Sequence, residues 1–286
     1  MRWRGGNSRV VDVFVDVDAH RFTADIIKRH STNRTDIRRI ALEGCSLSGY
    51  RRILELGCGF GFFTEALEGR LPNDAVVTGV DVITGYEALF MHVCRHVGVR
   101  GRFLPADAAI IKEFESRSVD LAICSYSLYF FPELISEIAR ILHPDGLFIA
   151  TVHNGDNMGE LISFVRNTLA AHDLALHSSI LPIERYLTRC SSENGHILLS
   201  PWFGEIEVRG YKNSLVFKPQ DLYALLEYLR FKWPFFLDAT ADLGKIFDLF
   251  EIHLQQSLGH DGDCFVVSKD DTIFLCSQPL CDKGRL

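Results

Sequence analysis

Short apolar runs alternate with amphipathic stretches along the chain between residues 51 and 153. The apolar runs have the length of β-strands, and the stretches between them carry apolar residues at helical spacing. This alternation is typical of repeated βα units built around a parallel sheet. The predicted strands are 52–56, 75–80, 101–104, 119–124 and 146–153, and the predicted helices are 64–69, 86–96 and 133–142.

The pattern changes on both sides of this region. Before it, amphipathic helices that pack beside the carboxyl edge of the sheet are predicted at 21–29 and 35–43. After it the βα rhythm is lost, and helices are predicted at 161–172, after Pro219 and at 239–256. Turn signals lie at three places. They predict a stop and turn at 143–146, a pair of strands 205–209 and 214–218 around 210–213, and a hairpin of 264–268 with 272–277 turned at Asp270-Asp271.

Composition narrows the class of protein only slightly. The chain has 286 residues, of which 47% are hydrophobic and 23% charged, as in an ordinary folded domain. Its formal net charge of -7 argues against a nucleic acid backbone as the main partner. Eight cysteines show neither CxxC pairs nor zinc-ligand spacing, and no apolar run is long enough for a membrane span. We therefore expect reduced thiols, a cytoplasmic location and no membrane partner.

The strongest local signal is the string ELGCGFG at 55–61, which lies between a predicted strand and a predicted helix. Glycines at alternate positions allow a tight strand-to-helix turn and close approach of a ligand to the backbone. A dinucleotide fingerprint would need a third glycine at position 62, where the chain has Phe62. The spacing therefore disfavours NAD or FAD and the nucleotide-dependent oxidoreductases that use them.

Two acids follow the next two predicted strands. Asp81 ends the strand that follows the glycine loop, where a carboxylate can accept hydrogen bonds from the hydroxyls of a ribose. Asp107 ends the strand after that and can accept from an exocyclic amine, with the Ala108 amide near an adenine ring. The alternative for Asp107 is a helix N-cap.

Taken together, these motifs resemble the class I S-adenosylmethionine-dependent methyltransferases, in particular their small-molecule branch. The resemblance covers about residues 20–278 and also includes the 119–127 strand end and the segment 139–146. It implies an α/β fold with a Rossmann-like, mostly parallel seven-stranded sheet, an antiparallel C-terminal hairpin, helices on both faces and an inserted lid after the fifth strand. We expect an N-terminal helical segment at 1–50, a cofactor-binding core at 51–154, a substrate-covering insertion at 155–218 and completion of the core at 219–278.

The resemblance also implies roles for individual residues. The loop glycines would pass beneath the methionine part of S-adenosylmethionine, Asp81 would hold its ribose, and Asp107 would bind its adenine amine. The side chains expected to face the sulfonium come from the loop and from the fourth strand. The full set of expected cofactor contacts is Glu55, Gly57, Cys58, Gly59, Gly61, Asp81, Val82, Asp107, Ala108, Ser125 and Tyr126.

The acceptor site is expected at the end of the fifth strand. We interpret His153 as a base or an orienting residue for the acceptor, helped by Tyr129 or Tyr126; a structural hydrogen-bonding role is the alternative. Candidate substrate contacts are Asn154, Trp202 and Tyr211. His92 and His96 have metal-ligand spacing but no third ligand, so no metal is expected.

The strand end at 125–130 lacks the Asn/Asp-Pro-Pro-aromatic string and the Pro-Cys pair of nucleic-acid methylating enzymes. Together with the acidic balance, this favours a small organic acceptor over nucleic acid. Two alternatives stay open: a protein or RNA methyltransferase, and a non-catalytic protein that has kept the cofactor fold. The sequence does not determine which O, N or C atom is methylated, or the oligomeric state.

Overall fold

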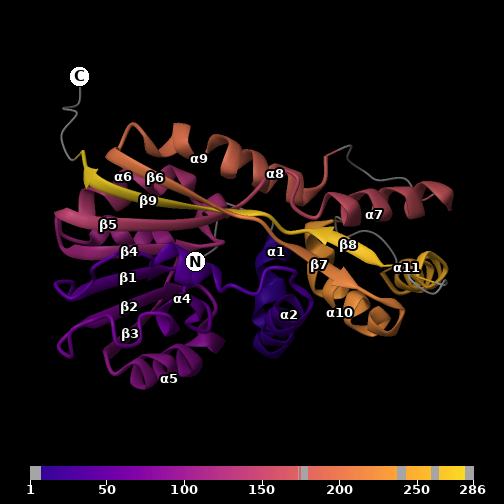
Figure 1. The fold of residues 1–286 in the computed structure, drawn as a ribbon, viewed down its shortest axis with the longest axis horizontal. Coiled ribbons are helices and arrows are strands. Elements are labelled where there is room, and N and C mark those ends of the chain that lie inside the picture. The colour runs from indigo at the N-terminus through magenta and orange to yellow at the C-terminus, as the bar shows by residue number, and fades with distance from the viewer. Residues whose placement is uncertain (1–7, 173, 175–179, 237–242, 259–263, 281–286) are drawn as a thin grey trace.

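The computed structural model describes residues 8–172, 174, 180–236, 243–258 and 264–280. Its centre is a seven-stranded sheet of order β3-β2-β1-β4-β5-β9-β6 (Figure 1). All neighbouring pairs are parallel except those of β9, which is antiparallel to both β5 and β6. This arrangement confirms the predicted fold class. The strands are β1 (Arg52–Leu56), β2 (Val76–Asp81), β3 (Arg100–Pro105), β4 (Val119–Ser125), β5 (Leu142–His153), β6 (Phe203–Tyr211) and β9 (Asp271–Pro279).

Two faces of the sheet bury separate apolar clusters, because successive side chains of a strand point to opposite faces. Leu54, Ala122 and Phe148 contribute to one cluster, which also contains the buried face of α6 (Ile135–Ile141). Ile53, Leu121 and Ile149 contribute to the other, under α4 (Phe62–Glu65) and α5 (Glu87–Val97). The near-continuous apolar strands of the sequence are therefore strands covered on both faces.

A second sheet of two strands extends the first beyond its carboxyl edge (Figure 1). It pairs β7 (Ser214–Phe217) with β8 (Phe265–Ser268). Both predicted local pairings, 205–209 with 214–218 and 264–268 with 272–277, are thus wrong: β6 pairs with β9, and β7 pairs with β8. Between the two sheets, the Asn213 amide donates to the Asp270 carboxylate. The polar segments that were predicted to be turns are therefore the places where the chain passes from the main sheet into the small one. The long-range partner, which a local turn pattern does not report, decides the pairing.

Several boundaries also differ from the predictions. The predicted turn at 143–146 lies inside β5, where the pairing with β4 shifts between Val119 and Leu121. This places an irregularity in the strand instead of a break before it. β6 lies in the segment expected to be an insertion, yet it is an edge strand of the main sheet. Residues 239–242 of the last predicted helix lie outside the described residues.

The remaining helices pack around the two sheets. Among the described residues, α2, α10, α7 and α11 surround the small sheet, whereas α8 and α9 lie along the β6 side of the large one (Figure 1). No helix in the described ranges has the length and apolarity needed to cross a membrane. These helices are α1 (Ser8–Asp12), α2 (Val17–His30), α3 (Ile37–Ala41), α7 (Gly159–Ala171), α8 (Pro182–Arg189), α9 (Ser192–Leu199), α10 (Leu222–Lys232) and α11 (Leu243–Ser257).

Candidate active site

The glycine loop forms the turn between β1 and α4 that the sequence predicted. Gly57, Gly59 and Gly61 all have positive φ angles, of 68°, 49° and 86°. A Cβ atom at Gly57 would lie 2.6 Å from the Ser127 side chain, so packing requires that glycine. A Cβ atom at Gly59 would meet no protein atom within 4 Å. The backbone at Gly59 therefore borders space that a ligand, and not the protein, can fill.

Asp81 ties this loop to the end of β2. One carboxylate oxygen accepts a hydrogen bond from the Gly59 amide at 2.9 Å, and the other accepts from the Ile83 amide at 2.9 Å. Burial raises the pKa of Asp81, and these backbone donors act in the opposite direction. Each oxygen keeps a second lone pair that can accept from a hydroxyl. Val82, the next residue, is 42% exposed and offers an apolar surface beside the carboxylate.

Glu55, one of the expected cofactor contacts, lies buried beneath α4. Its carboxylate is 2% exposed and accepts from the Thr64 hydroxyl at 2.5 Å, at the start of α4. Burial raises the pKa of Glu55 to about 7, although the hydrogen bonds from Thr64 and the Phe63 amide oppose this. The side chain accepts hydrogen bonds at a helix terminus inside the protein. Cys58, at 1% exposed, is likewise a core residue.

Two other expected contacts can be placed. Asp107 accepts from the Ala109 amide at 2.8 Å and is the N-cap of the 3-10 turn Ala108–Glu113, as the alternative interpretation held. The Ser125 hydroxyl, at the end of β4, is buried without a hydrogen-bond partner among the described residues. The open backbone at Gly59, the spare acceptors of Asp81 and this hydroxyl fit the hydroxyl and amine groups of an adenosine-containing cofactor.

A cluster of polar side chains lies at the carboxyl ends of β4 and β5. His153 Nδ1 lies 2.6 Å from Asp271 Oδ1, and Asp271 Oδ2 accepts from the Tyr126 hydroxyl at 2.8 Å. Lys269 Nζ lies 3.2 Å from Asp271 Oδ2 and 4.9 Å from the centre of the Tyr126 ring. The rings of Tyr126 and His153 stack with centres 4.7 Å apart. Among the described residues, the buried Asp271 carboxylate thus has three side-chain partners: His153, Tyr126 and Lys269.

This geometry determines which nitrogen of His153 carries the proton and whether the imidazole is charged. An ionised carboxylate only accepts, so Nδ1 carries the proton and donates it to Asp271, which leaves the lone pair on Nε2. Burial lowers the pKa of His153 to about 4, and Lys269 adds to this effect against the opposing Asp271. Burial disfavours the Asp271 anion, but Lys269 and His153 lower its pKa overall. The imidazole is therefore neutral near pH 7.

The sequence did not indicate two of these partners. Asp271 and Lys269 lie more than a hundred residues from His153, and Asp271 was assigned to a turn. The only sequence signal was an acid next to the apolar run 272–277. In the structure Asp271 is the first residue of β9 and is 2% exposed. The β5–β9 register, which pairs His153 directly with Asp271, creates the cluster.

The other candidate residues lie at different distances from this cluster. The Tyr129 ring lies 6.3 Å from that of His153, and the Asn154 amide oxygen accepts from the Thr272 hydroxyl. Tyr211 pairs with Asp271 across the sheet and donates its hydroxyl to the Thr35 carbonyl.

Trp202 does not belong to the site. Its neighbour Phe203 pairs with Pro279, eight rungs along β9 from Asp271, or about 26 Å at ~3.3 Å per residue. The substrate role predicted for Trp202 is therefore wrong. Its aromatic side chain is partly buried and packs on the core beside β6.

A second cluster, also unforeseen, faces the glycine loop. His20 of α2 lies 2.7 Å from the Tyr86 hydroxyl, which donates to the Phe14 carbonyl at 3.0 Å. Because that single proton goes to Phe14, His20 Nδ1 is the donor to Tyr86. The imidazole lies 5.1 Å from the ring of Phe60, inside the loop itself. Burial lowers the pKa of His20 to about 3, with Lys232 adding to the effect.

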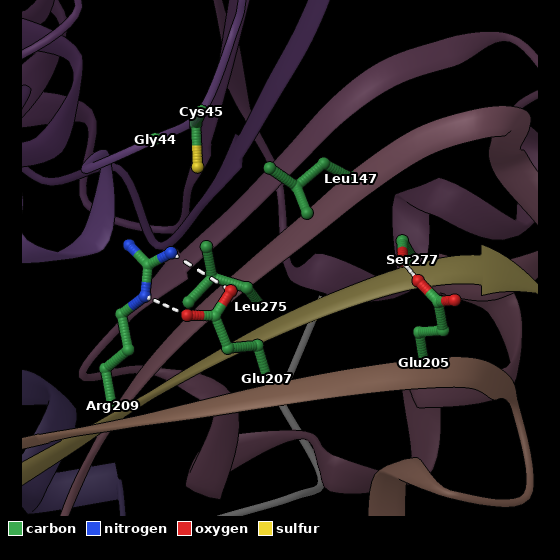
Figure 2. A pocket seen from close by; sticks show the side chains of 8 residues that line it. All are labelled: Gly44, Cys45, Leu147, Glu205, Glu207, Arg209, Leu275 and Ser277. Carbon is green, nitrogen blue, oxygen red and sulfur yellow. Dashed lines mark hydrogen bonds and ion pairs between the residues drawn. The ribbon is translucent and has the colours of Figure 1, made fainter.

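A hollow of about 400 Å³ lies on the sheet face, and none of the site residues described above lines it. Figure 2 shows the side chains that line it. Leu275 lines it and lies four rungs along β9 from Asp271, about 13 Å at ~3.3 Å per residue. Arg209, its most basic group, pairs with Glu207 and donates to the Ile40 and Glu43 carbonyls. These contacts bind the Arg209 guanidinium to Glu207 and to the end of α3. The guanidinium is therefore already engaged and is not available to bind a ligand in the hollow. Within the described ranges, no three His, Cys, Asp or Glu side chains are placed to hold a metal ion.

Comparison with known proteins agrees with this geometry. Residues 54–150 match a family model described as a methyltransferase domain. The aklanonic acid methyltransferase DauC of Streptomyces sp. (strain C5) is 29% identical over 89 residues. That match covers 31% of this chain and 40% of the relative, so the chain spans less than half the length of this curated relative.

Two solved structures share the fold. The YcgJ protein of Bacillus subtilis aligns with a TM-score of 0.54 and 17% identity, over 84% of this chain and 97% of its own. The BH2331 protein of Bacillus halodurans C-125 aligns with a TM-score of 0.53 and 12% identity, over 85% and 98%. The chain therefore contains a segment that matches a methyltransferase domain, at residues 54–150, within this Rossmann-like sheet.

Proposed function

We propose that the chain transfers a methyl group from S-adenosylmethionine to a small organic acceptor held beside His153. The observation that carries this proposal is the contact between two halves of the site: the glycine loop, where the cofactor would bind, and the cluster around His153, where the acceptor would bind. Gly57 packs on Ser127, whose hydroxyl donates to the Leu56 carbonyl. Tyr126, the residue before Ser127, stacks on His153. One strand end thus connects the cofactor loop to a histidine with a free lone pair.

The residues of the loop would bind and orient the donor. The spare lone pairs of Asp81 would accept from the ribose hydroxyls, and the open backbone at Gly59 would lie under the methionine part. When bound, S-adenosylmethionine supplies an electrophilic methyl group on a sulfonium. Since methyl transfer is an in-line displacement, positioning the acceptor supplies much of the rate enhancement.

His153 would orient the acceptor through Nε2. For a hydroxyl acceptor, the carbon–oxygen bond forms as the carbon–sulfur bond breaks, and the hydroxyl proton passes to Nε2. The imidazolium that results is stabilised by Asp271, while the sulfonium charge is lost with the transfer. A conjugate acid with a pKa of about 4 suffices, because an O-methylated hydroxyl is a far stronger acid than imidazolium. The proposal keeps the expectation of a metal-free, cytoplasmic reaction without nucleic acid.

The cofactor half is tested by calorimetric titration with S-adenosylhomocysteine. We expect the wild type to bind and Asp81→Asn to weaken binding at least about tenfold, since hydrogen bonds to a charged group contribute about 1.5–3 kcal/mol. Asp74→Asn is the matched control, because Asp74 is exposed and precedes the opposite end of β2. Absence of binding to the wild type would reject the proposal.

The acceptor half is tested by transfer of labelled methyl from S-adenosylmethionine to phenols, amines and carboxylic acids. We expect His153→Gln to lower kcat for a hydroxyl acceptor by about 10²-fold or more, the usual range for a lost proton acceptor. Affinity for S-adenosylhomocysteine should stay within twofold, which would show that the fold is intact. Unchanged kcat would remove His153 from the mechanism.

A further inference from the structure

The last residue of α10, Lys232, places its ammonium among aromatic rings. Its Nζ lies 5.9 Å from the centre of the Tyr228 ring, 5.6 Å from that of Phe231 and 5.4 Å from that of Phe235. Among the described residues it forms no hydrogen bond or ion pair with a carboxylate. A partly buried ammonium without an anion is costly, and ring faces compensate for this only in part.

Lys232 is joined to both halves of the site by ring contacts. On one side, Phe231 stacks on His20 at 5.4 Å, and His20 contacts Phe60 of the glycine loop at 5.1 Å. This path leads from the ammonium to the cofactor loop through two aromatic side chains.

On the other side, Phe235 lies 6.2 Å from Tyr186, which lies 5.7 Å from Tyr129. Tyr129 in turn lies 6.3 Å from His153. Phe235, Tyr186 and Tyr129 therefore connect Lys232 to the proposed catalytic histidine by ring contacts.

The charges in the acceptor half of the site do not cancel. Lys269 and Asp271 neutralise each other at 3.2 Å, and both histidines are neutral near pH 7. Burial lowers the pKa of Lys232 to about 7, and Lys269 adds to this while Asp271 opposes it. An anion bound at Nζ would replace the lost hydration and favour the charged amine.

We propose that Lys232 binds the carboxylate of the methyl acceptor, and that the acceptor is therefore a small aromatic hydroxy acid. The carboxylate is the recognition group at Lys232, and a separate hydroxyl lies at His153. The aromatic side chains between them would pack on the ring of the acceptor. This inference rests on the proposed function and specifies its substrate class.

The test compares matched acids and amides on protein saturated with S-adenosylhomocysteine. The probes are 4-hydroxybenzoate, 4-hydroxycinnamate and 6-hydroxy-2-naphthoate, each with its primary amide, titrated by calorimetry. We expect at least one acid to bind about tenfold or more tighter than its amide, since a charge-assisted hydrogen bond contributes about 1.5–3 kcal/mol. Lys232→Met should remove this preference, and Lys232→Arg should retain most of it.

Lys112→Met is the control, because Lys112 is an exposed lysine in the 3-10 turn Ala108–Glu113. Equal affinity for acid and amide, no binding of any acid, or an unchanged preference in Lys232→Met would each overturn the inference. Should Lys232→Met lose affinity for S-adenosylhomocysteine, the wild-type comparison of acid and amide still decides. Failure of the wild type to bind S-adenosylhomocysteine would instead reject the proposed function.

Discussion

At the scale of single residues, burial decides the chemistry of the site more than residue type does. His153 and His20 are both neutral because surrounding side chains exclude water from them. Tyr126 has a left-handed backbone, with φ 56°, which is uncommon for an aromatic residue and places its ring on His153 while its hydroxyl bonds Asp271. The same three residue types in an exposed loop would titrate independently and hold no fixed orientation.

Acid stability should report the buried state of His153. Its pKa is about 4 in the folded chain and 6.5 ordinarily, so the unfolded state binds more protons between these values. Stability is therefore fully present above about pH 6.5 and falls as the pH drops toward 4, by up to about 3 kcal/mol at ~1.4 kcal/mol per unit. Lys269, Lys232, Asp271 and Tyr126 are the charged or titratable groups around it.

The measurement is urea unfolding of wild type and His153→Gln from pH 7.5 to 4.5. We expect the stability difference between the two proteins to shift toward the variant as the pH falls. Glu55 acts in the opposite direction, because its raised pKa of about 7 removes stability as the pH rises from 4.5 to 7. It is present in both proteins, so its effect cancels in the difference. A difference that does not change with pH would show that His153 titrates normally.

At the scale of elements, short helices are held by side chains from distant strands. Glu55 of β1 accepts a hydrogen bond at the start of α4, and Arg209 of β6 donates to carbonyls at the end of α3. Both helices are too short to be stable alone, so these contacts supply part of what propensity cannot. The predicted helix 35–43 is correspondingly shorter in the structure, at Ile37–Ala41.

Arg209 offers a direct test of this arrangement. Arg209→Met should lower the free energy of unfolding by about 1–3 kcal/mol, because it leaves helix-end carbonyls without donors. Glu207→Gln should change it by less than about 1 kcal/mol, since the Glu207 side chain is 60% exposed and its ion pair with Arg209 is screened by water. Equal effects of the two substitutions, measured by urea denaturation, would show that the ion pair and not the helix end matters.

At the scale of the whole molecule, the ribbon formed by β6–β7 and β8–β9 joins two regions (Figure 1). In the main sheet, its strand β9 begins at Asp271, at the carboxyl edge. Its other strands, β7 and β8, form the small sheet that packs with α2 and α10. The ribbon thereby assembles the carboxyl edge, His20 and Lys232 around one site. We propose that α8, in the segment between β5 and β6, covers this site and contributes Tyr186 beside Tyr129.

Hydrogen exchange tests this covering role. Amides of α8 should exchange at least severalfold more slowly when S-adenosylhomocysteine and an acceptor acid are bound, because ligand contact reduces local opening. The neighbouring helix α9 is the internal control, since Gly195 packs closely on Phe274 of β9 in the absence of a ligand. Equal protection of α8 with and without ligands would contradict the covering role.

The sequence by itself determined the βα core and the glycine loop, because their signals are local. Apolar runs of strand length, glycines at alternate positions and an acid at the end of a strand each depend on residues within a few positions. The structure accordingly has β1 at the predicted bounds, Gly57, Gly59 and Gly61 in the turn, and Asp81 bonded to Gly59.

Only the tertiary structure decided the rest of the site. Asp271 meets His153 through sheet register, and His20 and Lys232 reach the same region from helices at opposite ends of the chain. Trp202 was misassigned because an aromatic side chain that packs on a core and one that binds a ligand have the same sequence pattern. Local patterns specify which elements form, but strand partners far apart in the sequence specify which side chains share water-excluded space, and that exclusion sets their charge.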